Sequence, residues 1–256
     1  MRTPDELRDA VESYLVALPV HADLGALAES VRYALESGGK RIRPVLCLAV
    51  AEAAGGEVEE ALPAAAAVEL VHTFSLVHDD LPALDDDDER RGRPSTHVAF
   101  GEGVAILAGD ALLAEAFRLT LTYDDDGFAR ELVEATLGMI GGQYRDIAGD
   151  DADLAAVERL KTGRLFAASV GLGVRAAGVP EEEQATWRRF GWELGALFQV
   201  VDDILDDDGF AARLGRKEAR RLADETARRA RERLQVVPAD TSVLRELVDG
   251  LATRTV

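Results

Sequence analysis

The sequence predicts an all-α protein, a single large helical bundle around a central apolar cavity. Three observations carry this prediction. Alanine, leucine, glutamate and arginine dominate the chain, and all four favour helix. Apolar residues recur every three or four positions instead of alternating, which is the period of a helix. The segments 58–80 and 181–207 are apolar around most of their circumference, as helices in the middle of a bundle are.

Glycine and proline divide the first half of the chain into helices. Gly38-Gly39 ends the second expected helix and Gly55-Gly56 the third, while Pro94-Ser95 opens the fifth. The expected helices of this half cover residues 4–18, 23–37, 43–54, 58–80 and 95–122.

The second half keeps the same apolar spacing, and Gly178 with Pro180 separates two of its helices. Pro238 marks a later boundary. The expected helices cover residues 127–147, 153–178, 181–207, 211–235 and 240–253. Since no stretch has the composition of a linker, residues 1–256 are expected to form one domain.

The charge balance limits the classes of function. The chain has 48 acidic and 29 basic residues, a formal net charge of -19, which opposes binding to nucleic acid and to anionic membranes. Its one cysteine, Cys47, excludes an internal disulfide. The N-terminal stretch MRTPDELRDAVESYL lacks the order of a signal peptide, and no uninterrupted apolar run reaches spanning length. We therefore expect a soluble, cytoplasmic protein without membrane insertion.

The first acidic cluster is in VHDDLPALDDDDERRGRP, from Val77 to Pro94. Seven of the eleven residues from Asp79 to Glu89 are acidic, and such carboxylates repel one another unless a cation lies among them. The cluster therefore either faces solvent or holds a metal ion. On a helix, His72 and Ser75 share the face of Asp79 that looks into the bundle.

The second acidic cluster is in FQVVDDILDDD, from Phe198 to Asp208. Asp202 and Asp206 lie one helical turn apart, with Asp203 beside them and Gln199 one turn earlier. Both clusters follow apolar runs, so both are expected at the mouth of a cavity. Oxygen ligands favour magnesium over zinc, and magnesium prefers phosphate oxygens. A solvated acidic surface is the alternative.

Three short segments supply cations. GGKRIRP carries Lys40, Arg41 and Arg43, RRGRP carries Arg90, Arg91 and Arg93, and KTG begins at Lys161. Arginine forks suit phosphate oxygens, and loops bounded by glycine and proline hold them within reach of a ligand. Each segment alone is more readily explained by salt bridges to the acidic surface. Together with two acidic clusters above an apolar cavity, they predict a site where a diphosphate leaves an allylic carbon.

As a set, these motifs resemble the trans-isoprenyl diphosphate synthases, also called polyprenyl synthetases. The matching segments occur in order along most of the chain: GGKRIRP, HTFSLVHDDLPALDDDDERRGRP, GQYRD, KTG and FQVVDDILD. The resemblance implies an isoprenoid synthase-like bundle, usually a homodimer, that condenses isopentenyl diphosphate with an allylic diphosphate using several Mg²⁺ ions. It also implies that the departing diphosphate takes the proton, so no side chain is expected as general base.

The resemblance further implies roles for individual residues. The expected metal ligands are Asp79, Asp85, Asp202, Asp203 and Asp206. The allylic diphosphate is expected on Arg90, Lys161, Thr162 and Gln199, and isopentenyl diphosphate on Lys40, Arg43, His72 and Arg91. The expected catalytic set is Asp79, Asp85, Asp202, Arg90 and Lys161. Gln143 and Asp146 match the family pattern without an assigned role, and Asp86, Asp87, Asp88 and Glu89 are expected to be solvated.

Phe74 is the expected determinant of product length. It lies five residues before Asp79, about 7.5 Å lower along the helix axis, where its ring would close the cavity. Ordinary core packing is the alternative role. An aromatic residue there, with the two-residue expansion of the first acidic motif, resembles bacterial farnesyl diphosphate synthases and implies a C15 product. Small neighbours, Ser75 among them, leave a C20 product, geranylgeranyl diphosphate, open.

One stretch departs from the family pattern. The family continues after the second acidic motif with a lysine-bearing loop, which is absent between Gly209 and Phe210, and shorter deficits fall near Asp124 and Gly149. Lys217 does not replace the loop lysines because it begins the next helix. Intact flanking motifs favour a loop missing from the sequence; otherwise the chain lacks a closing lid.

Two other functions therefore stay open. A non-catalytic subunit of a prenyl synthase would explain the absent lysines. A terpene cyclase shares the acidic motifs, but it handles one diphosphate and so has no need of both GGKRIRP and RRGRP.

Overall fold

The computed structural model describes residues 1–149 and 154–254, and most of these are helical. The predicted all-α class is confirmed. The α-helices are α1 (Pro4–Ala17), α2 (Leu27–Leu35), α3 (Ile42–Ala53), α4 (Val58–Asp79), α5 (Thr96–Phe100), α6 (Glu102–Thr120), α7 (Gly127–Ile147), α8 (Leu154–Glu158), α9 (Arg164–Ala176), α10 (Gln184–Asp206), α11 (Gly209–Leu214), α12 (Arg216–Gln235) and α13 (Ser242–Ala252). Shorter turns are η1 (Ala22–Leu24), η3 (Arg159–Gly163) and η4 (Glu181–Glu183).

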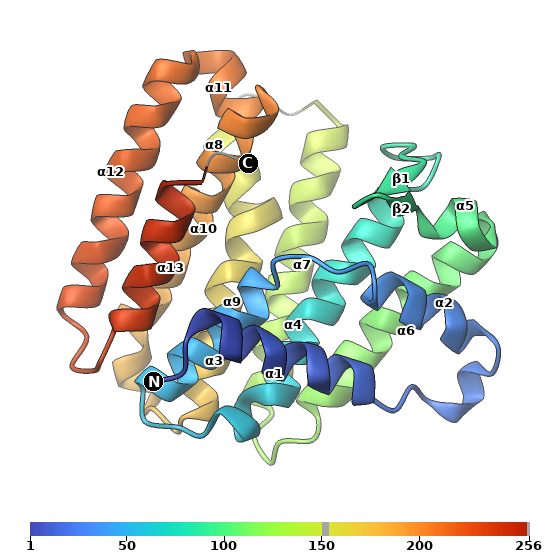
Figure 1. The fold of residues 1–256 in the computed structure, drawn as a ribbon, viewed down its shortest axis with the longest axis horizontal. Helices are drawn as coiled ribbons and strands as arrows, with labels where there is room; N and C mark the ends of the chain where they lie inside the picture. Colours follow the sequence, from blue (N-terminus) through green and yellow to red (C-terminus); the bar gives the residue numbers. More distant parts are fainter. Residues whose placement is uncertain (150–153, 255–256) are drawn as a thin grey trace.

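Helix α4 is the central element of the bundle. It packs most extensively on α6 and also contacts α3, α7 and α9, while α10 packs against both α9 and α12. Figure 1 shows α12 and α13 towards one end of the longest axis, and α5 with the small β1–β2 hairpin towards the other. Buried apolar side chains from α1 to α13 form one continuous core cluster.

The sequence of α4 explains its central position. Residues 64–68 are all buried, so the middle of the helix has no solvent face. Within the described residues, α4 is the one helix long and apolar enough to span a membrane, and Glu59, Glu60 and Glu69 interrupt its apolar residues. Of its most apolar stretch, 67% is buried inside the protein, as in the core helix of a soluble protein.

Helix α10 is buried around most of its circumference, as the sequence predicted, and has one exposed strip. Trp187, Leu194 and Val201 are buried against its neighbours, whereas Arg189 and Ala196 are exposed. The helix therefore lies between α9 and α12 and presents only this strip to solvent.

Glycine residues break two helices that were predicted as continuous. Gly101 separates α5 from α6 and Gly215 separates α11 from α12, with φ of 87° and 82°. An α-helix excludes such angles, and glycine adopts them without steric cost. Three further predicted helices begin or continue with irregular turns: 23–37 becomes η1 and α2, 181–207 becomes η4 and α10, and the described part of 153–178 becomes α8, η3 and α9.

A β-hairpin, which the sequence did not predict, carries the RRGRP segment. Strands β1 (Glu89–Arg90) and β2 (Arg93–Pro94) pair antiparallel around Arg91 and Gly92, whose φ angles are 56° and 77°. Two consecutive left-handed residues are the mark of a type I′ turn. The Tyr33 hydroxyl of α2 donates to the Pro94 carbonyl oxygen over 2.8 Å. The segment is therefore a hairpin fastened to α2 and not an open loop.

Candidate active site

The two acidic clusters face one cavity. Asp79 and Asp85, from the end of α4 and the turn after it, line a cavity of about 810 Å³ together with Asp202 and Asp206 from the end of α10. Asp79 and Asp202 therefore do not lie on separate outer faces of the bundle. This common cavity is the candidate site.

The carboxylates form two separate groups and not a metal cage. Among residues 1–149 and 154–254, no three Asp, Glu, His or Cys side chains are grouped to hold a metal ion by themselves. Mg²⁺ in proteins is commonly bound by one or two carboxylates and completed by substrate phosphate oxygens. The donor set therefore fits Mg²⁺ that binds together with a diphosphate.

The electrostatics of these carboxylates favour a cation. The pKa of Asp79 is raised to about 6, chiefly by burial, with Lys161 lowering it and the charges of Asp85 and Asp80 raising it. Burial also raises the pKa of Asp202, opposed by Arg254. Carboxylates with such pKa values are poorly compensated in the free protein, so a nearby cation stabilises their charged form.

The second aspartate of each DD pair turns away from this cavity. Asp80 is 3% exposed and accepts a hydrogen bond of 2.9 Å from Arg90 Nε, so it orients Arg90. Asp203, expected as a metal ligand, does not line the cavity. Its oxygens accept hydrogen bonds from Gln199 Nε2 at 2.6 Å and from the Phe210 N–H at 2.7 Å.

A second, smaller cavity of about 480 Å³ adjoins the first and gathers cations. Arg43, His72, Arg91 and Phe198 line both cavities. Side chains lining only the second one include Lys40, Arg41 and Arg254. Every residue that the resemblance assigned to isopentenyl diphosphate therefore lies at this cavity.

Arg43 and His72 are held in defined states. The Arg43 guanidinium lies 4.7 Å from the ring centroid of Phe166 and 5.4 Å from that of Phe198. Burial lowers the pKa of Arg43 to about 10, so it stays charged at neutral pH. Burial, together with the charges of Arg43 and Arg91, lowers the pKa of His72. His72 is therefore a neutral hydrogen-bonding group there.

Two arginines of these motifs have structural roles. Arg41, with φ of 46°, turns inward and donates to Glu69 at 2.6 Å and to Glu12 at 2.7 Å. The Arg93 guanidinium lies 4.2 Å from the centroid of the Tyr33 ring. They hold the cationic segments in place.

Lys161 and Thr162 both line the large cavity although they are adjacent in sequence. They lie in η3, a π-helical turn, which presents more consecutive side chains to one side than an α-helix does. Gly142 of α7 allows this turn to approach, because a Cβ at that position would lie 2.5 Å from the backbone nitrogen of Lys161.

Hydrogen bonds join η3 to the other walls. Lys161 Nζ donates to Asp146 Oδ2 at 2.6 Å, and Thr162 Oγ1 donates to Gln199 Oε1 at 2.7 Å. Asp146, which had no assigned role, thus positions Lys161. Gln143, the other such residue, lines the cavity.

The apolar part of the large cavity contains residues that sequence reasoning missed. Phe74 and Ser75 line it as expected, and Glu89, expected to be solvated, also does so. The missed residues are Leu76, His78, Leu84, Met139, Ile140, Tyr144, Ile147, Leu165 and Phe198. The four on α7 recur at the helical period, a signal that was visible but is shared by any amphipathic helix.

The junction after the second acidic motif is short. In the structure the chain passes from α10 through Asp207 and Asp208 directly into α11. Of the three lysines in the sequence, Lys161 alone lines the large cavity. The deficit expected near Gly149 borders residues 150–153, which lie outside the described residues.

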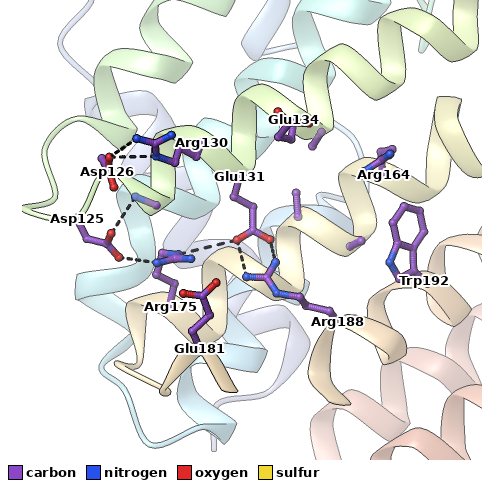
Figure 2. Close-up of a pocket in the computed structure, with 14 residues that line it drawn as sticks. Asp125, Asp126, Arg130, Glu131, Glu134, Arg164, Arg175, Glu181, Arg188 and Trp192 are labelled. Atoms are coloured by element: carbon purple, nitrogen blue, oxygen red, sulfur yellow. Dashed lines mark hydrogen bonds and ion pairs between the residues drawn. The ribbon is translucent and has the colours of Figure 1, made fainter. Parts of the chain in front are cut away.

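A further cavity, of about 650 Å³, lies between α7, α9 and α10. Figure 2 shows Arg175 between Asp125 and Glu131, with Arg188 on the other side of Glu131. Arg175 donates to Asp125 at 2.7 Å and Arg188 Nη2 to Glu131 at 2.9 Å. Arg130, Arg175 and Arg188 thus already have carboxylate partners, and none of the predicted site residues lines this cavity.

The fold and the large cavity define an all-helical protein with opposed carboxylates and clustered cations above an apolar pocket. The family model for polyprenyl synthetase matches residues 25–226. Since this covers more than half of the chain, the chain belongs to the polyprenyl synthetase family, and the resemblance inferred from the motifs is confirmed.

Individual relatives agree with this assignment. A geranylgeranyl diphosphate synthase of Cyanophora paradoxa is 42% identical over 78% of this chain and 71% of its own length. A farnesyl diphosphate synthase of Bacillus subtilis is 41% identical over 75% and 70%. Among solved structures, a geranyltransferase from Legionella pneumophila has a TM-score of 0.84 at 32% identity, covering 98% of this chain and 96% of that one.

Proposed function

We propose that this protein is a short-chain prenyltransferase that joins isopentenyl diphosphate to an allylic diphosphate. One observation carries the proposal: the two adjoining cavities share Arg43, His72 and Arg91, and the acidic clusters lie in one of them. One cavity offers carboxylates for metal-bound diphosphate, and the other is lined mainly by cations, with its carboxylate, Glu69, paired to Arg41. Two diphosphates would therefore be held side by side. The names of the relatives, farnesyl and geranylgeranyl diphosphate synthases, support the same class of enzyme.

In this proposal, Mg²⁺ ions are held by Asp79 and Asp85 on one wall and by Asp202 and Asp206 on the other. Bound with the allylic diphosphate, they would neutralise the charge of the leaving group. The allylic diphosphate contacts Arg90, Lys161, Thr162 and Gln199. Asp203 orients Gln199 through their hydrogen bond of 2.6 Å, and Asp80 orients Arg90.

Isopentenyl diphosphate is assigned to Lys40, Arg43, His72 and Arg91, with Arg254 added by its position beside them. The apolar lining from α4 and α7 would exclude water from the allylic cation. The departing diphosphate accepts the final proton, so the proposal gives no side chain the role of general base.

The proposed main product is farnesyl diphosphate (C15), because the buried ring of Phe74 lies in the cavity wall near the end of α4. Geranylgeranyl diphosphate (C20) is the second candidate, since the relatives include synthases of both names.

The deciding experiment is incubation with isopentenyl diphosphate, Mg²⁺ and C5, C10 or C15 allylic diphosphates in turn, followed by product sizing. We expect elongation of the C5 and C10 partners. No elongation with any partner would contradict the proposal and favour a non-catalytic subunit. A hydrocarbon formed without isopentenyl diphosphate would indicate a terpene cyclase. Reading the coding sequence between Gly209 and Phe210 tests for the absent lysine loop.

A homodimer, formed through α6 and α7, is part of the proposal. Several large apolar side chains are exposed on these helices, among them Leu107 (55%), Leu137 (59%) and Ile140 (47%). An exposed apolar face of this kind favours contact with a second copy, against the repulsion from the net charge of -19. Sedimentation velocity should give a dimer for the native chain and a monomer for Leu137→Asp. The proposed location is the cytoplasm.

A further inference from the structure

The ring of Phe74, the proposed end of the cavity, is held by a second ring. His78 lies one turn later on α4, and the two ring centroids are 5.4 Å apart at an interplanar angle of 86°. This edge-to-face arrangement is a preferred geometry for aromatic pairs. In the described part of the chain, His78 is the one aromatic side chain paired with Phe74 in this way.

His78 is fixed in turn by α6. Its Nε2 lies 3.0 Å from the carbonyl oxygen of Ile106. A carbonyl oxygen only accepts hydrogen bonds, so Nε2 carries the proton and donates it. The orientation of the imidazole is therefore set by the backbone of a neighbouring helix.

Gly109 provides the space for this imidazole. A Cβ added at Gly109 would overlap the His78 ring, so a side chain there would displace it. Gly109 is buried where α6 packs on α4, which is the most extensive helix contact of the bundle. The absence of a side chain at this position thus lets His78 lie flat between the two helices.

The consequence concerns the depth of the cavity. Both Phe74 and His78 line it. For a growing chain to pass Phe74, the ring must turn aside, and the space on the α6 side is filled by His78. The imidazole therefore blocks a movement that would deepen the cavity.

We propose that His78 and Gly109 determine product length together with Phe74. His78 is a positioning residue that keeps the Phe74 ring across the cavity. Gly109, which has no side chain, leaves the space that the His78 ring occupies. This inference rests on the proposed function, because product length can be measured only if the protein elongates an allylic chain.

The test is the product distribution of variants, measured with isopentenyl diphosphate and C5, C10 or C15 allylic partners. His78→Ala should shift the main product upward by at least one C5 unit. His78→Phe retains the ring and should keep the native product. Gly109→Ala should push the imidazole towards the cavity and raise the share of shorter, C10 product. His21→Ala, an exposed histidine remote from the cavity, is the matched control and should change nothing.

A double variant separates positioning from a direct effect. If His78 acts through Phe74, Phe74→Ala/His78→Ala should give the same product as Phe74→Ala alone. Further lengthening in the double variant would overturn the positioning role. If His78→Ala does not fold, His78→Ser, which also vacates the space on the α6 side, carries the same expectation of a longer product.

Failure of this inference is distinguishable from failure of the proposed function. If the native protein elongates but the His78→Ala and His78→Ser products equal the native one, the inference is wrong and the function stands. If the native protein elongates no partner, the function itself is wrong and the inference falls with it.

Discussion

The guanidinium of Arg254 lies 3.1 Å from a carboxylate oxygen of Asp202, so an arginine near the end of the chain occupies one of the proposed metal ligands. The side chains are 20% and 36% exposed, which places the pair at the mouth of the site. In the free protein this contact supplies positive charge that Mg²⁺ would supply in the complex.

Removing this competitor should strengthen metal binding. We expect Arg254→Gln to lower the Mg²⁺ concentration for half-maximal turnover about fivefold, since a partly exposed ion pair is worth about 1 kcal/mol. The measurement is a Mg²⁺ titration at saturating substrates, with Arg245→Gln on the exposed side of α13 as control. An unchanged or increased Mg²⁺ requirement would show that Arg254 does not compete for Asp202.

Loss of either acidic wall should abolish turnover. Asp79→Ala and Asp202→Ala each remove a proposed ligand for the ion that stabilises the leaving diphosphate, and we expect a loss of about a thousandfold or more. Circular dichroism should report native helical content in both. Asp86→Ala, an exposed aspartate of the same cluster, should retain activity. Native turnover in either cavity variant would contradict the metal assignment.

Truncation of the proposed floor should lengthen the product. Phe74 is 6% exposed and lines the cavity, so Phe74→Ala removes a ring from the path of the growing chain. We expect C20 or longer products from the same substrates, measured by chromatography. A product of unchanged length means that the cavity ends at another residue, and that Phe74 serves core packing alone.

The helical period predicted most of the fold, and the two helix breaks that it missed have one physical origin. Apolar spacing continues across Gly101 and Gly215. Periodicity alone therefore predicts continuous helices where the positive φ of a glycine ends one helix and begins the next. The turn of the β-hairpin is likewise a backbone property of Arg91 and Gly92. A positive φ at one or two residues depends on the local backbone conformation, which the apolar pattern of the sequence does not predict.

The site was predictable where a motif ends a buried helix. Asp79 and Asp202 terminate apolar runs, and both line the large cavity. Arg254 was not predictable, because a lone arginine in an arginine-rich chain has no local signal and reaches Asp202 through the path of α13 alone. The inward turn of Asp203 depends on the Phe210 N–H, a tertiary contact that helical spacing does not encode.

Glu131 should stabilise the fold without affecting chemistry. Its side chain is 11% exposed and pairs with Arg188, with Arg175 3.9 Å away. Glu131→Ala leaves two guanidinium groups without their shared carboxylate. We expect a loss of about 2 kcal/mol in the free energy of unfolding, discounted for the partial exposure of Arg188. Urea unfolding measures it, with exposed Glu134→Ala as control. Equal stability of the two variants would contradict this role for the network.

Glu158 should make stability depend on pH. Burial, and then the charge of Asp203, raise its pKa from 4.5 to about 7, while Lys161 lowers it. Within the described residues, its Oε2 has no hydrogen-bond partner. An acid whose pKa is raised by folding contributes stability that is complete below the unfolded value, 4.5, and is lost as pH rises through about 7.

Substituting Glu158 should therefore stabilise the protein in alkaline solution only. Glu158→Gln removes the cost of burying a carboxylate, so we expect it to exceed the native chain by on the order of 2 kcal/mol at pH 8. At pH 4.5 the difference should nearly vanish, because the native carboxyl is then protonated in the folded state. Urea unfolding in the presence of a metal chelator gives both values, and Glu182→Gln, on the exposed η4 turn, is the matched control. A stability difference that is the same at both pH values would mean that Glu158 does not carry the expected proton.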